Sequence, residues 1–130
     1  MTGTLIFTCE IPGSPVPKER ARKGGYNWYT PDKTVTAEDN IVAYVRQTIP
    51  GLQVDEESIF GLELAFHLKP YQGRSLPPDI DNLLKLVLDA LNTVVYQDDR
   101  QVLEVKMRKH LNSDNPRTVF SVFKITEVEA

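Results

Sequence analysis

Two clusters of aspartates could bind a divalent cation. Asp79 and Asp81 are two residues apart, and Asp98 and Asp99 are adjacent. Carboxylate oxygens are the ligands that hard cations such as Mg²⁺ prefer, and no cysteine or histidine stands close to either pair in the sequence. The residue types therefore suit a magnesium-dependent site for phosphodiester chemistry.

A lysine lies between the two clusters. The sequence from residue 79 predicts an amphipathic helix that begins at Asp79 or Asp81. At about 100° per residue, Asp81, Lys85 and Asp89 share its polar face. Lys85 could act on the scissile phosphate or on the leaving oxygen, with Asp89 orienting it. An ordinary ion pair between residues four apart would account for the same spacing.

Simpler explanations exist for both acidic clusters. Aspartate often caps helices, so spacing alone leaves Asp79 and Asp81 open between caps and metal ligands. For Asp98 and Asp99, spacing alone favours a polar turn. The expected helix of about fifteen residues is a little over 20 Å long. Asp99 follows the C-terminal end of this helix in the sequence. The fold must therefore return Asp99 toward the start of the helix if the two clusters form one site.

A basic and aromatic segment near the N-terminus is a candidate nucleic-acid contact. Positive side chains can hold phosphates, and aromatic rings can stack on unpaired bases. The alternative is a solvated loop with its rings packed on the core. Residues 24–25, both glycine, predict a turn. The net charge of −3 argues against nucleic-acid binding through bulk charge alone. The candidate DNA-binding residues are Lys18, Arg20, Arg22, Lys23, Trp28 and Tyr29.

The remaining sequence predicts an α+β fold in the order β-α-β-α-β-β. Strands are expected at residues 4–11, 59–69, 101–111 and 118–128, and helices at residues 34–49 and from residue 79 or 81. Thr36 is the expected N-cap of the first helix, and residues 112–116 predict a hairpin-type turn between the last two strands. The length of 130 residues is that of one domain, so residues 1–130 are expected to form a single domain.

Composition narrows the cellular setting. The single cysteine, Cys9, excludes an internal disulfide framework and a cysteine-rich zinc site. The N-terminus lacks the pattern of a signal peptide, and no apolar run approaches the roughly 18 residues of a membrane span. We therefore expect a cytoplasmic protein with no membrane partner.

The central signature resembles the RusA family of Holliday junction resolvases, which are small homodimeric endodeoxyribonucleases often carried by prophages. The resemblance is dense over about 25 central residues and sparse elsewhere. The central residues that carry it are Asp79-x-Asp81-Asn82-x-x-Lys85-x-x-x-Asp89-Ala90-Leu91-Asn92 and Tyr96-x-Asp98-Asp99-x-Gln101-Val102. The N-terminal residues that carry it are Pro12-Gly13-x-Pro15, Lys18-x-Arg20-x-Arg22 and Tyr29-x-Pro31.

The resemblance implies a function and a set of site residues. Asp79, Asp81 and Asp99 would bind Mg²⁺, with Asp98 as a possible further ligand, and Lys85 would be the essential lysine. Mn²⁺ is expected to substitute for Mg²⁺. The fold implied is a mixed sheet with two helices packed on it, in an intimate homodimer. The substrate implied is a four-way DNA junction, resolved by paired symmetric nicks in recombination and repair.

Two departures from the family pattern and two alternative functions accompany this interpretation. Residues 77–78 are prolines where basic residues are frequent, and residues 93–95 lack the usual glycine. One alternative is a non-catalytic protein that binds junctions or single strands, although such a protein would gain by losing acids that repel phosphate. The other is a metal-dependent enzyme that acts on a different phosphate ester.

Overall fold

A computed structural model describes residues 3–19, 22–25, 27–29, 31–70 and 76–126, with the side chains of residues 22, 23, 27 and 29 excluded. The described chain is an α+β fold, as the sequence predicts. Its elements are β1 (Gly3–Pro12), β2 (Arg22–Gly24), β3 (Asn27–Tyr29), α1 (Asp32–Thr48), β4 (Phe60–His67), α2 (Ile80–Leu91), the 3₁₀ helix η1 (Asp99–Gln101), β5 (Val102–His110) and β6 (Arg117–Ile125).

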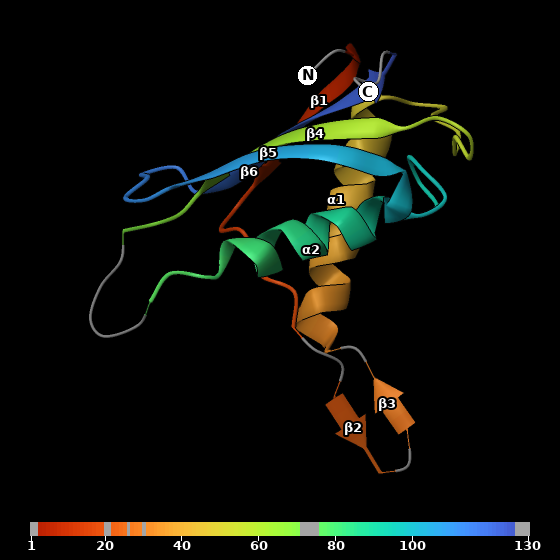
Figure 1. Cartoon of the computed structure of the whole chain (residues 1–130). Coiled ribbons are helices and arrows are strands. Elements are labelled where there is room, and N and C mark those ends of the chain that lie inside the picture. The colour runs from red at the N-terminus through yellow and green to blue at the C-terminus, as the bar shows by residue number, and fades with distance from the viewer. Residues whose placement is uncertain (1–2, 20–21, 26, 30, 71–75, 127–130) are drawn as a thin grey trace.

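The main sheet is four-stranded and mixed, in the order β1-β6-β4-β5. Strand β6 runs antiparallel to both β1 and β4, whereas β4 and β5 are parallel. Helix α2 lies between β4 and β5 in the sequence, so the three elements form a β-α-β unit. Figure 1 shows both helices on the same face of this sheet.

The hydrophobic core lies between that face of the sheet and the two helices. Alternate residues of β4, among them Leu62, Leu64 and Phe66, are buried, which confirms the predicted apolar face of this strand. Helix α2 is apolar over most of its circumference, and α1 packs against it. The buried residues of α2 are Leu83, Leu86, Val87, Ala90 and Leu91.

Three local predictions need correction. Strands β5 and β6 are not neighbours, because β4 lies between them, so residues 112–116 do not form a hairpin turn. Helix α1 begins at Asp32 after Pro31, which has no side-chain cap bond, and Thr36 lies inside the helix. The fixed φ of proline suits a helix start, and it outweighed the capping preference of threonine.

The third correction concerns the basic and aromatic segment near the N-terminus. The sequence predicted only a turn there, whereas the structure contains a short hairpin. Strands β2 and β3 pair antiparallel, with Gly24 opposite Asn27. Gly25 has a φ of 63°, in the left-handed region that glycine adopts readily, which confirms the predicted turn. The hairpin extends beyond the N-terminal end of α1 (Figure 1).

Within the described residues, neither α1 nor α2 has the length and hydropathy that a membrane-spanning helix requires.

Candidate active site

Asp79 is the N-cap of α2. Its backbone is extended, and its Oδ1 accepts a hydrogen bond from the backbone N–H of Asp81 at 3.0 Å. This confirms that the helix starts where the sequence predicts, and it shows that Asp79 does cap. A carboxylate has two oxygens and several lone pairs, so capping and ligation are compatible. Asp81 follows in the first turn, where its exposed carboxylate faces the positive end of the helix dipole.

Lys85 lies one turn further along α2, between two carboxylates. Its Nζ is 3.1 Å from Oδ1 of Asp89 and 3.4 Å from Oδ2 of Asp99. The hydrogen bond to Asp89 is the main reason that the pKa of Lys85 is raised above its ordinary value. Lys85 therefore remains an ammonium at neutral pH, and it can supply positive charge but cannot act as a general base.

Asp99 is brought back to the middle of α2 by a chain reversal directly after the helix. Thr93 has a φ of 63°, and its N–H donates to the carbonyl of Tyr96 at 2.6 Å. Tyr96 is fully buried, and its hydroxyl donates to the carbonyl of Leu88 at 2.9 Å. These bonds hold the returning chain against the helix, so the two acidic clusters lie on the same side of the molecule despite the length of α2.

The turn that carries Asp99 is closed by a capping box. Asp98 is the N-cap of η1, and its carboxylate accepts from the N–H of Arg100 at 3.0 Å. This bond is the largest cause that lowers the pKa of Asp98 below its ordinary value. Gln101 completes the box from the N3 position. The polar turn favoured by the spacing is thus present, and it presents Asp99 to Lys85.

Gln101 stabilises this turn, a role that was not predicted for it from the sequence. Its Oε1 accepts from the N–H groups of Gln97 and Asp98 at 2.8 and 3.2 Å. Its Nε2 donates to the carbonyls of Asp55 and Ser58 at 2.8 and 2.9 Å. All four bonds that a glutamine amide commonly makes are formed. The sequence signal was present, since Asp98 followed three residues later by Gln101 is a capping-box pattern.

Lys18 lies between the two helices. Its backbone N–H donates to the carbonyl of Asn82 in α2 at 2.8 Å. Its Nζ is 3.0 Å from Oε1 of Glu38 and 3.2 Å from Oδ2 of Asp89. The ammonium therefore joins α1 to α2 from a partly buried position. A DNA contact by Lys18 stays a prediction, but its ammonium already forms ion pairs with two carboxylates.

The other predicted DNA-binding residues lie in or near the β2–β3 hairpin. Trp28 is 70% exposed in β3, a large exposure for an indole ring. Arg22, Lys23 and Tyr29 are placed by backbone only, and Arg20 lies outside the described residues. The hairpin thus presents at least one aromatic ring to solvent, which is consistent with the predicted stacking role and does not test it.

The predicted metal ligands have the right chemistry, although they are not assembled around one point. Asp79, Asp81 and Asp99 offer only carboxylate oxygens, the donor set that Mg²⁺ and Mn²⁺ take. Across the described part of the chain, no three acidic, histidine or cysteine side chains lie close enough together to hold one ion. Close carboxylates repel one another, and a bound cation is what offsets that repulsion. The donor set fits a divalent cation, and the ligand assignment stays a prediction.

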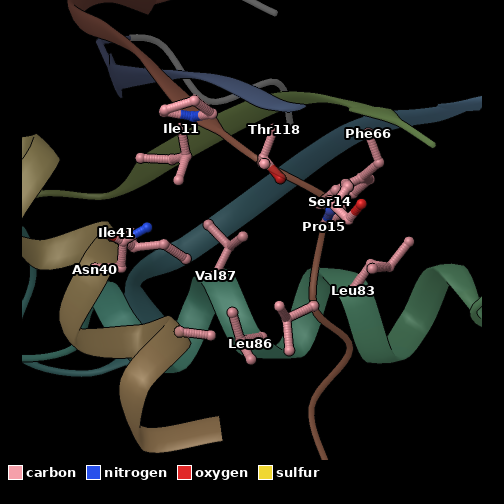
Figure 2. A pocket seen from close by; sticks show the side chains of 14 residues that line it. Ile11, Ser14, Pro15, Asn40, Ile41, Phe66, Leu83, Leu86, Val87 and Thr118 are labelled. Carbon is pink, nitrogen blue, oxygen red and sulfur yellow. The ribbon is translucent and has the colours of Figure 1, made fainter. Parts of the chain in front are cut away.

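A small cavity beside the site is apolar and carries no chemistry. Its volume is about 70 Å³, and it lies where the segment after β1 crosses the inner faces of α1 and α2 (Figure 2). Apolar side chains of Leu83, Leu86 and Val87 form its α2 wall. The predicted metal ligands and Lys85 are absent from its lining, so this cavity is separate from the candidate site.

Comparisons with known proteins identify a family. A family model described as "Endodeoxyribonuclease RusA" matches residues 12–122, which include α2, η1 and the segment of Lys18. The "Uncharacterized protein YqaN" of Bacillus subtilis (strain 168) is 41% identical over 49 residues, which make up 38% of this chain. The aligned segment spans about a third, 34%, of that relative.

Proposed function

The chain belongs to the RusA endodeoxyribonuclease family, and on that premise we propose that it hydrolyses phosphodiester bonds at four-way DNA junctions. The observation that carries the proposal is the position of Lys85. A protonated lysine lies between Asp89 and Asp99, on the helix that Asp79 and Asp81 begin. Residues from two separate segments thus meet at Lys85, which supports a role for this lysine beside a bound phosphate.

The proposed chemistry divides the work between the carboxylates and the lysine. Asp79, Asp81 and Asp99 would hold Mg²⁺, or Mn²⁺ in its place, with Asp98 as a possible further ligand. A bound ion would supply an activated water and would stabilise charge on the phosphate. Lys85 stabilises the negative charge that develops on the phosphoryl oxygens or on the leaving oxygen. Its ammonium, held by Asp89 and Asp99, suits an electrostatic role.

Resolution of a junction requires two symmetric cuts. We propose that a homodimer supplies them, because a twofold dimer presents two identical sites. Paired nicks at a four-way junction would place the protein in DNA recombination and repair. The β2–β3 hairpin is the proposed contact to DNA beyond the cleavage site, through phosphates and unpaired bases.

The test is cleavage of a synthetic four-way junction with Mg²⁺, alongside linear duplex and small phosphodiesters. We expect paired nicks in the junction and about a hundredfold or greater loss for Asp81→Asn, which removes one charged oxygen donor. Activity of Asp81→Asn equal to that of the wild type would overturn the assignment of the site. Binding without cleavage during long incubation would favour a junction-binding protein, and activity on small diesters alone would favour another phosphate-ester hydrolase.

A further inference from the structure

Asp89 divides its carboxylate between two lysines. Its Oδ1 is 3.1 Å from Nζ of Lys85, and its Oδ2 is 3.2 Å from Nζ of Lys18. Its side chain is 18% exposed. Both oxygens of a partly buried carboxylate are therefore used, and its rotamer is defined from two sides. Charged hydrogen bonds of this kind are stronger than neutral ones.

Lys18 is held at both ends. Its backbone N–H is bonded to Asn82, and its ammonium contacts Glu38 and Asp89. Its side chain is 24% exposed, whereas that of Lys85 is 52% exposed. Partial burial lowers the pKa of Lys18. The interactions with Glu38 and Asp89 outweigh this effect, so the pKa is raised above its ordinary value. Lys18 is thus a fixed internal cation rather than a free phosphate-binding side chain.

Lys85 needs such support because of its exposure. A lysine has a flexible four-carbon stem and regains rotamer freedom when its ammonium is released. Asp89 and Asp99 compete for its ammonium from opposite sides. Loss of Lys18 would remove one of the two lysines that contact Asp89 and would release its second oxygen, so Asp89 could rotate and take Lys85 with it.

We propose that Asp89 and Lys18 are positioning residues that fix the ammonium of Lys85 for the cleavage step. The inference rests on the proposed function, and it reassigns Lys18 from DNA contact to site geometry. Five charges of alternating sign form the row that does this, from α1 through the segment after β1 to α2 and η1. In order they are Glu38, Lys18, Asp89, Lys85 and Asp99.

The first experiment separates positioning from DNA contact through Lys18→Met. We expect kcat on a four-way junction to fall about tenfold to a hundredfold, because small displacements of a catalytic group have effects of that size. The Kd for the junction in EDTA, and its dependence on salt, should stay unchanged. A phosphate contact would instead weaken binding and reduce the slope of log K against log salt by about one. That outcome would overturn the proposal.

The second experiment tests whether the two residues act together. Asp89→Asn should lower kcat by a similar factor. The double variant with Lys18→Met and Asp89→Asn should have a kcat no lower than that of the less active single variant. Lys18→Arg keeps the charge and should recover part of kcat. Lys106→Met is the matched control, since Lys106 is an exposed lysine of β5 outside the charge row. Additive losses in the double variant would contradict a shared role.

A measurement in the absence of DNA tests the positioning of Lys85 independently of the proposed function. Nuclear magnetic resonance relaxation of the Lys85 side chain should show lower order in Lys18→Met and Asp89→Asn than in the wild type. Urea unfolding of each variant confirms that it is folded. If the wild type cleaves no DNA, the proposed function fails while the order of Lys85 still tests positioning. Unchanged order in both variants would overturn the positioning role.

Discussion

At the scale of single residues, the site is defined by how each carboxylate uses its two oxygens. Asp79 uses one for the backbone of Asp81, and Asp89 uses one for each of two lysines. The sequence left capping and ligation as alternatives for Asp79. The structure shows that capping is real, so the question becomes whether the same carboxylate also binds the ion. Two substitutions at this position can answer it.

Asp79→Asn should separate the two roles of this residue. Asparagine caps helices about as well as aspartate, so the free energy of unfolding should change by less than about 0.5 kcal/mol. It removes the charge that a divalent cation requires, so junction cleavage should fall about a hundredfold or more. Asp79→Ala should lose cleavage and also about 1 kcal/mol of stability. Full activity in Asp79→Asn would restrict Asp79 to capping.

At the scale of elements, sequence patterns predicted α2 and the four strands of the main sheet well. Period-two burial in β4 and the Asp79 cap depend on neighbours in sequence, which is where such patterns are informative. The return of Asp99 to Lys85 was not predictable. It depends on the buried anchor Tyr96 and on the left-handed Thr93, whose roles are set by tertiary contacts. The pair of Lys85 and Asp89 was predicted from their spacing, whereas the contacts of Lys18 with Asp89 and Glu38 were not, for the same reason.

Gln101 should be essential for the turn that presents Asp99. Gln101→Glu puts a carboxylate opposite the carbonyls of Asp55 and Ser58, where it cannot donate. We expect a loss of about 1–3 kcal/mol in the free energy of unfolding, together with lower cleavage. Urea denaturation measures the first. Gln97→Glu, at an exposed side chain of the same turn, is the control and should change stability by less than about 0.5 kcal/mol. Equal stability of the two variants would contradict this role.

Asp55 should make the loop before β4 sensitive to acid. Hydrogen bonds from Ser58, through side chain and backbone, and from the N–H of Glu57 hold the pKa of Asp55 well below its usual range. A lowered folded pKa means that the stabilisation is complete above the unfolded value of 3.8 and is lost as pH falls through the folded pKa. Asp55→Ala should therefore cost about 1 kcal/mol at pH 7.

The check is the difference in unfolding free energy between wild type and Asp55→Ala across pH. The difference should be constant from pH 7 to about pH 5 and shrink below about pH 4. A difference that stays the same at low pH would show that the charge of Asp55 does not matter to the loop.

At the scale of the whole molecule, the sheet order was the feature that local patterns predicted least well. The expected hairpin between the last two strands is replaced by a connection that passes β4. Strand β6 lies between β1 and β4 because register between distant segments decides pairing, and turn residues alone do not. The hairpin β2–β3 extends away from this body and is available to a large substrate (Figure 1).

Trp28 should contribute to DNA binding and have little effect on stability. It is 70% exposed, so Trp28→Ala should leave the free energy of unfolding almost unchanged. Stacking on an unpaired base is worth about 1–3 kcal/mol, so the Kd for a junction should rise between about fivefold and a hundredfold. Fluorescence anisotropy in EDTA measures this. Trp28→Phe keeps an aromatic face and should lose less. An unchanged Kd in Trp28→Ala would remove the hairpin ring from the DNA interface.

The central claim is that two acidic segments and Lys85 form one metal-dependent site. A crystal structure of the protein with Mn²⁺, located by its anomalous signal, tests it most directly. We expect the ion at about 2.1 Å from oxygens of Asp79, Asp81 and Asp99, with the ammonium of Lys85 beside it. An ion bound elsewhere, or bound by Asp79 and Asp81 while Asp99 stays on Lys85 alone, would contradict the claim.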